Sequence, residues 1–269
     1  MTNEQLLSLA IHASVEAGIE ILKVYEKPIE VETKEDNSPL TAADKASHEA
    51  IKVFLDKTGI PVLSEEGKEI DFAERKNWNR LWIVDPLDGT KEFIKRNGEF
   101  TVNIALVENG FPVMGVIYVP VLNQLYFGWE KGAFFLSGKS PQDVMALSKD
   151  VSALSKQCET LPSVNYADGI TRIVASRSHN TPETDEFIQQ TEKNRGKVEL
   201  VSMGSSLKIC LVAHGKADLY PRFAPTMEWD TAAGQAIAEA SGKQFINYST
   251  GKRMDYNREN LRNDWFLVS

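Results

Sequence analysis

The chain has 269 residues, of which 42% are hydrophobic and 25% charged, a composition typical of a globular protein with one large or two small domains. Its 30 Lys and Arg against 38 Asp and Glu give a net charge of −8, which argues against nucleic acid bound through a basic surface. Two cysteines are too few for a disulfide framework, the N-terminus lacks a signal-peptide pattern, and no apolar run approaches the roughly 20 residues of a membrane span.

The first part of the chain predicts two amphipathic helices and two short strands. In the first helix, apolar side chains recur every three or four residues, Thr2 and Gln5 form a capping box, and Pro28 provides the stop. Each strand is followed directly by acidic residues. The expected ranges are 3–27 and 41–58 for the helices, and 61–63 and 81–84 for the strands.

From residue 100 onward the pattern becomes that of an antiparallel meander. Asn109-Gly110 separates two apolar runs, and such a pair is the strongest short-range signal for a hairpin. Lys131-Gly132 marks a second turn. The expected strands are 101–107, 113–119, 124–129 and 133–136.

Residues 137–169 are polar and weakly patterned, so we take them as the boundary between an α+β domain at 1–150 and an α/β domain at 151–269. Beyond this boundary, strands and helices alternate. Thr181 and Pro182 open one helix, and two more end at glycines. The expected helices begin at 182, 205 and 230, and the expected strands are 172–175, 198–201, 217–220, 244–247 and 265–268.

The most informative string is Asp85-Pro86-Leu87-Asp88-Gly89-Thr90, where an apolar strand runs into two carboxylates separated by a turn containing proline. Such a turn can expose the Leu87 carbonyl beside both acids, and these are the hard oxygen ligands that Mg²⁺ selects. At Gly89 and Thr90, free backbone N–H groups could hold a phosphate. A plain turn uses the same residue types, but the whole string after a strand favours a metal and phosphate site.

Two further acidic segments, Ser64-Glu65-Glu66 and Glu228-Trp229-Asp230, follow a strand or open a helix. Exposure to solvent is enough to explain the acids of the first segment, and stabilisation by the helix dipole is enough to explain Asp230, so neither segment by itself indicates a site. If they converge with the two aspartates, like charges 4 Å apart repel by ~4 kcal/mol at an effective dielectric of 20. Convergence therefore predicts a divalent cation.

Asp44 follows Thr41 at the start of the second expected helix, where capping that helix is one role open to it. A covalent mechanism is disfavoured by spacing. Phosphatases with an aspartyl nucleophile carry Asp-x-Asp before Gly-Thr, whereas this chain has Asp-x-x-Asp, which re-aims the second acid and argues against Asp85 as the nucleophile.

The chain resembles the inositol monophosphatase superfamily of Mg²⁺-dependent, lithium-sensitive phosphatases, and within it the 3'(2'),5'-bisphosphate nucleotidases. The resemblance spans nearly the whole chain and is weakest between residues 138 and 168. It implies a layered α/β/α/β/α fold with the site between the two halves. The segments that carry it are 38–44, 61–66, 85–93, 97–103, 176–179, 204–208 and 219–223.

The resemblance also implies a role for each site residue. Asp44 and Thr90 would orient and deprotonate the attacking water. The ligands of two or three Mg²⁺ ions would be Glu65, Asp85, Asp88, Asp230 and the Leu87 carbonyl. The contacts to a small nucleotide bisphosphate would be Ser176, His179, Ser205, Ser206, Lys208 and Arg222, together with Glu65, Leu87, Asp88, Gly89, Thr90 and Asp230. Without the resemblance, Lys208 and Arg222 are expected to be solvated cations, and His179 is equally consistent with a helix cap before Thr181 and with a ligand contact.

The expected activity is removal of the 3'-phosphate of adenosine 3',5'-bisphosphate to give AMP, and likewise from 3'-phosphoadenylyl sulfate, in sulfate assimilation. The expected location is the cytoplasm, with contact to the inner face of the cell membrane left open. A phosphatase of inositol or sugar phosphates is an alternative on the same metal site. A non-catalytic nucleotide or Mg²⁺ sensor is a remoter one, disfavoured because Asp44 and Thr90 are both present. The sequence carries no signal for an oligomeric state.

Overall fold

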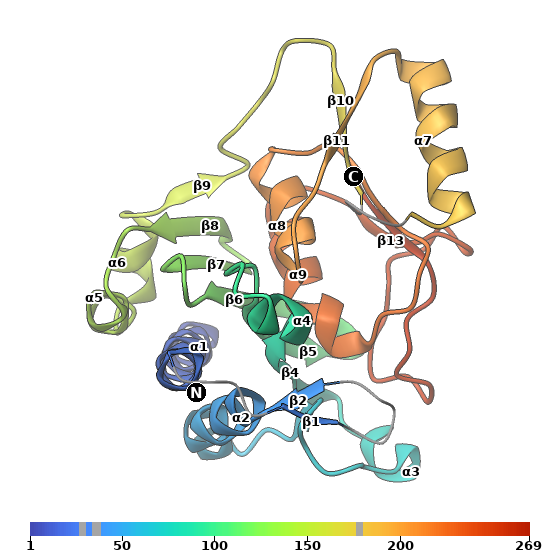
Figure 1. Ribbon diagram of the computed structural model, residues 1–269. Coiled ribbons are helices and arrows are strands. Elements are labelled where there is room, and N and C mark those ends of the chain that lie inside the picture. The colour runs from blue at the N-terminus through green and yellow to red at the C-terminus, as the bar shows by residue number, and fades with distance from the viewer. Residues whose placement is uncertain (27–30, 34–38, 176–179) are drawn as a thin grey trace.

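The computed structural model describes residues 1–26, 31–33, 39–175 and 180–269. Five successive layers of helices and sheets make up the molecule, from α1 and α2 at the lower left of Figure 1 to α7 at the upper right. This confirms the expected layered α/β/α/β/α fold. Within the described residues, no helix has the length and apolar character needed to span a membrane.

A seven-stranded sheet forms the second layer. Its strands lie in the order β3-β4-β5-β6-β7-β8-β9, with β3 and β4 parallel and every later pair antiparallel. The meander is confirmed, and Asn109 and Gly110 take the positive φ angles of a tight hairpin turn. The strands are β3 (Val62–Ser64), β4 (Arg80–Asp88), β5 (Thr101–Glu108), β6 (Phe111–Val119), β7 (Gln124–Trp129), β8 (Gly132–Ser137) and β9 (Glu159–Leu161).

Helices α1 (Asn3–Tyr25) and α2 (Ala42–Leu55) cover one face of this sheet. Successive side chains of β4 point to opposite faces of the sheet: Trp82 packs on the side of α1, and Ile83 packs on the other side. The capping box of Thr2 with Gln5 is present as expected.

Residues 137–169 contain more structure than their weak pattern predicts. Ser140 caps α5 (Pro141–Leu147) and Asp150 caps α6 (Val151–Ser155), and both helices add apolar residues to the core around α1. They are too short for helical periodicity to be visible in the sequence. Strand β9 then joins the large sheet beyond residue 150, and the division into two domains there stays a prediction.

Helices α8 (Leu207–His214) and α9 (Glu228–Ala240) form the middle layer, between the two sheets. Helix α9 lies very close to the large sheet where β6 has Gly115: a Cβ built there would lie 2.2 Å from the Ala233 carbonyl oxygen. Glycine is therefore required at this crossing. The helix expected from residue 205 begins two residues later, because Ser205 has a φ of 43° and cannot lie in a right-handed helix.

The second sheet and α7 (Pro182–Arg195) complete the layers. Strands β10 (Thr171–Val174) and β11 (Val198–Val201) are parallel, and a bridge from Ile173 to Leu219 joins them to the group β12-β14-β13. That group consists of β12 (Tyr220–Arg222), β14 (Phe266–Val268) and β13 (Phe245–Asn247). The strand expected at 217–220 begins later, at Tyr220: the Asp218 side chain accepts the Arg172 N–H, and Leu219 forms only a bridge before β12 begins.

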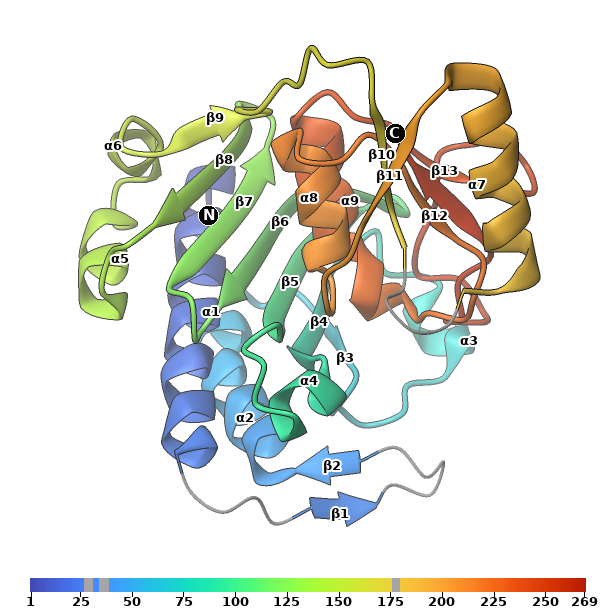
Figure 2. The same ribbon diagram turned by 45° about the horizontal axis from the view of Figure 1, so that its top comes forward.

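Four short elements surround the site and were missed from the sequence, each being too short to show a period. Figure 2 shows the hairpin of β1 (Val31–Thr33) and β2 (Pro39–Thr41) below α4 (Thr90–Ile94), and α3 (Phe72–Arg75) near the C-terminal loops. A single 3-10 turn at Asp56–Thr58 extends α2 to the left-handed Gly59, as the expected stop required.

Candidate metal and phosphate site

The end of β4 carries the first two acids of the site. Opposite β5, Asp85 pairs with Asn103 and Asp88 with Thr101, so β4 holds one extra residue in a β-bulge. The prediction that both acids follow the strand is therefore wrong. They lie within β4, because the bulge accommodates Pro86 and β4 pairs with β5 again at Asp88. The Asp85 carboxylate accepts the Leu87 N–H at 3.0 Å, which fixes the bulge.

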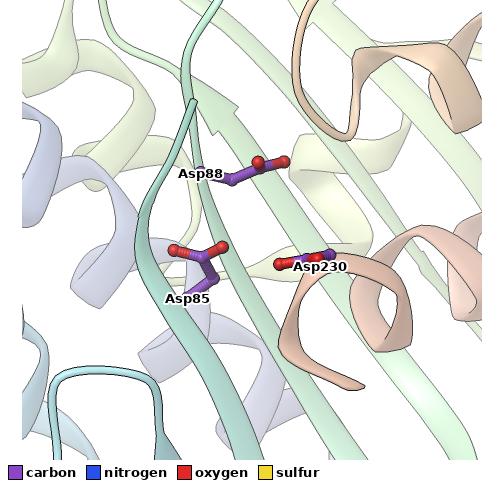
Figure 3. A group of neighbouring side chains, drawn as sticks. All are labelled: Asp85, Asp88 and Asp230. Carbon is purple, nitrogen blue, oxygen red and sulfur yellow. The ribbon is translucent and has the colours of Figure 1, made fainter. Parts of the chain in front are cut away.

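The third acid comes from far along the chain. Asp230 is the third residue of α9, and its carboxylate accepts the Met227 N–H at 2.8 Å across the helix start. One carboxylate oxygen from each of Asp85, Asp88 and Asp230 lies within 4.8 Å of the others. Figure 3 shows the three side chains converging from β4 and from the first turn of α9.

Burial raises the pKa of all three acids, and repulsion from neighbouring acids of the cluster adds to it at Asp85 and Asp230. Burial is the main cause of the raised pKa of Asp85, followed by the charges of Glu65, Asp88, Asp230 and Asp44. Burial and then Asp88 raise the pKa of Asp230 to about 7. Burial also raises the pKa of Asp88, against the lowering effect of Lys208. Acids in this state need protons or cations to lie together, as the sequence argument expected.

Two further acids, Glu65 and Asp44, lie near enough to this cluster for their charges to add to the burial that raises the pKa of Asp85. Glu65 comes directly after β3, where its N–H donates to the Val84 carbonyl at 3.2 Å. Asp44 is buried in the first turn of α2. One turn later, the Ser47 hydroxyl donates to the Pro86 carbonyl at 2.6 Å, which ties α2 to the bulge.

A buried hydroxyl and amide network holds Asp88 against the start of α8. The Ser206 hydroxyl and the Thr101 hydroxyl both donate to the Asn103 amide oxygen, at 2.9 and 3.0 Å. The Asn103 amide nitrogen and the Ser206 N–H then donate to the Asp88 carboxylate. Ser206 therefore braces a predicted metal ligand, a role that its sequence position did not reveal.

Ser205 lines the site next to this network, and Gly89, directly before Thr90, lies close to Ser205. Gly89 has a φ of 98° and a built Cβ would lie 3.3 Å from the Ser205 Cβ, so a larger residue would crowd the loop. Thr90 begins α4. The Ser205 hydroxyl is buried and has no hydrogen-bond partner within the described part of the chain, so it is available to a ligand.

Two adjoining cavities extend from the acids. The smaller, of about 80 Å³, is lined by Asp88 and Asp230 together with Lys208 and Arg222. The larger, of about 370 Å³, shares Lys208, Tyr220 and Arg222 with it. Burial lowers the pKa of Lys208, against the raising effect of Asp88. Ser176 and His179, expected at the nucleoside end, lie outside the described residues.

Sequence reasoning assigned no role to two acids at the larger cavity, Glu92 and Glu99, although both fall within segments of the family resemblance. The Glu99 carboxylate accepts the Gly204 N–H at 2.7 Å. A Cβ on Gly204 would lie 2.8 Å from the Glu92 side chain, so this glycine lets the loop before α8 pass close to α4.

Known proteins are similar in sequence to this chain over nearly its whole length. The model of the inositol monophosphatase family matches residues 2–264. The chain is 45% identical to the 3'(2'),5'-bisphosphate nucleotidase CysQ of Salmonella typhimurium, with 99% of this chain and 98% of that protein covered. It is 46% identical to the protein of the same name from Escherichia coli K12, with 94% and 95% covered.

Solved structures agree with these relatives. The crystal structure of CysQ from Bacteroides thetaiotaomicron, a bacterial member of the inositol monophosphatase family, is 51% identical with a TM-score of 0.87, covering 100% of this chain and 98% of that one. The IMPase of Thermotoga maritima is 22% identical with a TM-score of 0.69, covering 98% and 92%, and shares the fold.

Proposed function

The chain belongs to the inositol monophosphatase family, and from that premise we propose that it is a 3'(2'),5'-bisphosphate nucleotidase that hydrolyses adenosine 3',5'-bisphosphate to AMP and phosphate. The proposal includes 3'-phosphoadenylyl sulfate, which carries the same 3'-phosphate, and places the enzyme in sulfate assimilation in the cytoplasm. Relatives named as 3'(2'),5'-bisphosphate nucleotidases support it over nearly the full length of the chain.

The observation that carries the proposal is the arrangement of acids and cations along the two adjoining cavities. Asp88 and Asp230 lie at one end, and Lys208 and Arg222 line the junction with the larger cavity. A substrate whose first phosphate lies at the acids can place a second phosphate at the cations. A nucleoside bisphosphate offers this second phosphate, whereas an inositol monophosphate does not.

The acid cluster fits a divalent cation. Its members have raised pKa values and converge within 4.8 Å, and carboxylate oxygens are the ligands that Mg²⁺ prefers. Bound Mg²⁺ would acidify a water and neutralise charge on the phosphoryl group. We assign two or three ions to this site, with the ligands Glu65, Asp85, Asp88, Asp230 and the Leu87 carbonyl.

We assign water activation to Asp44 and Thr90. The bond from Ser47 to the Pro86 carbonyl holds α2, and with it the buried Asp44, against the bulge of β4. Thr90 follows the bulge directly. A threonine hydroxyl is a weak base by itself, but when a carboxylate accepts its proton, its oxygen can accept a proton from water.

The test separates the two phosphate positions. Charge-assisted contacts contribute ~1.5–3 kcal/mol each, so Lys208→Ala and Arg222→Ala should each cost about one to two decades in kcat/KM for adenosine 3',5'-bisphosphate. The loss should be much smaller for 3'-AMP, which has no 5'-phosphate. Equal losses on both substrates, or a wild-type preference for inositol 1-phosphate, would remove the nucleotidase assignment and leave a Mg²⁺ phosphatase of sugar phosphates.

A further inference from the structure

We propose that the loop at residues 257–263 is a clamp that sets the spacing of the metal centre, with Glu228 and Asn257 as its positioning residues. The clamp joins the segment after Glu65 to the first turn of α9, which carries Asp230. This inference rests on the proposed function, because it concerns the same metal ligands.

Glu228 anchors the clamp. It is the first residue of α9, and its side chain is 0% exposed. Its carboxylate accepts the backbone N–H groups of Asn257 and Arg258 at 2.7 and 3.0 Å, and the Arg258 guanidinium at 3.2 Å. A fully buried carboxylate with three donors is a strong and directional attachment. The loop is therefore fixed to the turn that presents Asp230.

Asn257 makes the connection to the other arm of the site. Its amide nitrogen donates to the Arg75 carbonyl at 2.7 Å, and its amide oxygen accepts from the Arg75 guanidinium at 3.2 Å. Arg75 is only 3% exposed and also donates to the carbonyls of Arg258 and of Glu259, the latter at 2.8 Å. It lies in α3, in the connection from β3 to β4 that begins with Glu65.

Asn263 braces the same turn from its other side. Its amide nitrogen donates to the Met227 carbonyl at 2.7 Å and to the Thr231 hydroxyl at 2.9 Å. The Met227 N–H in turn donates to the Asp230 carboxylate. Arg258 closes the network by donating to the Asn263 amide oxygen at 2.7 Å. The clamp thus orients the Asp230 carboxylate as well as the helix that carries it.

The arms that the clamp connects carry like charges, because one bears the Glu65 carboxylate and the other the Asp230 carboxylate. Repulsion between them favours a wider site than a small cation needs. Groups that orient metal ligands typically account for about 10–100-fold in metal affinity, and we expect the clamp to act in this range.

Asn257→Gly tests the clamp at the residue whose side chain bonds to Arg75. Asn257 has a φ of 63°, which glycine adopts freely, so the substitution removes both bonds to Arg75 without straining the backbone. Calorimetric titration of the EDTA-treated full-length protein should show the Kd for Mg²⁺ weakened about 10–100-fold. Activity should then need more Mg²⁺, with kcat at saturating Mg²⁺ much less affected. Asn257→Asp, which keeps the acceptor for Arg75, should restore part of the affinity.

Arg253→Gln is the matched control. It removes an arginine that donates to Glu239, near the C-terminal end of the same helix α9, at 2.6 Å, and to the Pro112 carbonyl of β6. Its Kd for Mg²⁺ should equal that of the wild type. If Asn257→Gly does not fold, Arg75→Lys weakens the same connection and should give the same shift.

If the wild type binds Mg²⁺ and the clamp variants bind it with the same Kd as the wild type, the clamp is refuted and the proposed function is not. An equal loss in Arg253→Gln would overturn it as well, because the effect would then follow general destabilisation. A wild-type protein that binds no Mg²⁺ would overturn the proposed function together with the clamp.

Discussion

Replacing Asp230 by asparagine should make the metal-free protein more stable while abolishing its stabilisation by Mg²⁺. The pKa of Asp230 is raised from its ordinary value of 3.8 to about 7, first by burial and then by the charge of Asp88. Its ionised form is therefore disfavoured in the native state. Asparagine keeps the acceptor for the Met227 N–H but carries no charge.

The sign and size of this effect follow from proton linkage. Between pH 4 and 7 the native protein binds more protons at Asp230 than the unfolded chain does, so stability falls as the pH rises through this window. The destabilisation is absent below about pH 4 and complete above about pH 7. A shift of this size corresponds to on the order of 4 kcal/mol, or roughly 10 °C in Tm for a chain of this length.

Thermal unfolding in EDTA at pH 5 and pH 8 measures the difference directly. The wild type should lose stability between these values, Asp230→Asn should lose less, and the variant should be the more stable protein at pH 8. Asp168→Asn is the control, because Arg172 lowers the pKa of Asp168 to about 2 and this carboxylate gains nothing from neutralisation. If metal-free Asp230→Asn is no more stable than the wild type at pH 8, the ionised carboxylate carries no burial penalty and the electrostatic argument fails.

Three further outcomes are expected. Asp44→Asn and Thr90→Ala should lower kcat by ~10²–10⁴-fold and leave the calorimetric Kd for Mg²⁺ nearly unchanged, and a Kd that weakened in step with kcat would transfer both residues to the metal. Below about pH 7, protons should compete at Asp230, so the Kd for Mg²⁺ should weaken by up to about tenfold per pH unit; a pH-independent Kd between pH 5 and 7 would contradict the raised pKa. Gly115→Ala should destabilise the protein by ~1–3 kcal/mol in urea unfolding, because its Cβ would lie 2.2 Å from the Ala233 carbonyl oxygen; unaltered stability would mean that α9 shifts freely.

Elements that are long and that also begin with a cap in their own residues could be predicted from the sequence. The capping box of Thr2 and Gln5 and the Thr181-Pro182 helix start lie where expected. The bulge of β4 could not be predicted, because its extra residue exists only relative to the pairing partners Asn103 and Thr101. The same holds for α5, α6 and β9, which are ordered by packing on α1 and β8.

The candidate site divides in the same way. The sequence string 85–90 alone indicated a metal site at Asp85 and Asp88, and the structure places Asp230 beside them. The residues that orient these acids left no such signal: Ser47 and Asn257 act through contacts with residues far away in the sequence. Their partners become visible only when the chain is folded.

Because α9 lies between the two sheets and is encoded late in the chain, the site can be completed only near the end of synthesis. Leu81 and Ile83 on β4 face the middle layer, and they stay uncovered until α8 and α9 have left the ribosome. The acid pair of β4 exists for more than half of synthesis without Asp230. A ribosome-bound chain that ends before residue 228 should therefore neither retain Mg²⁺ nor hydrolyse substrate, and activity begins only when α9 has emerged and docked.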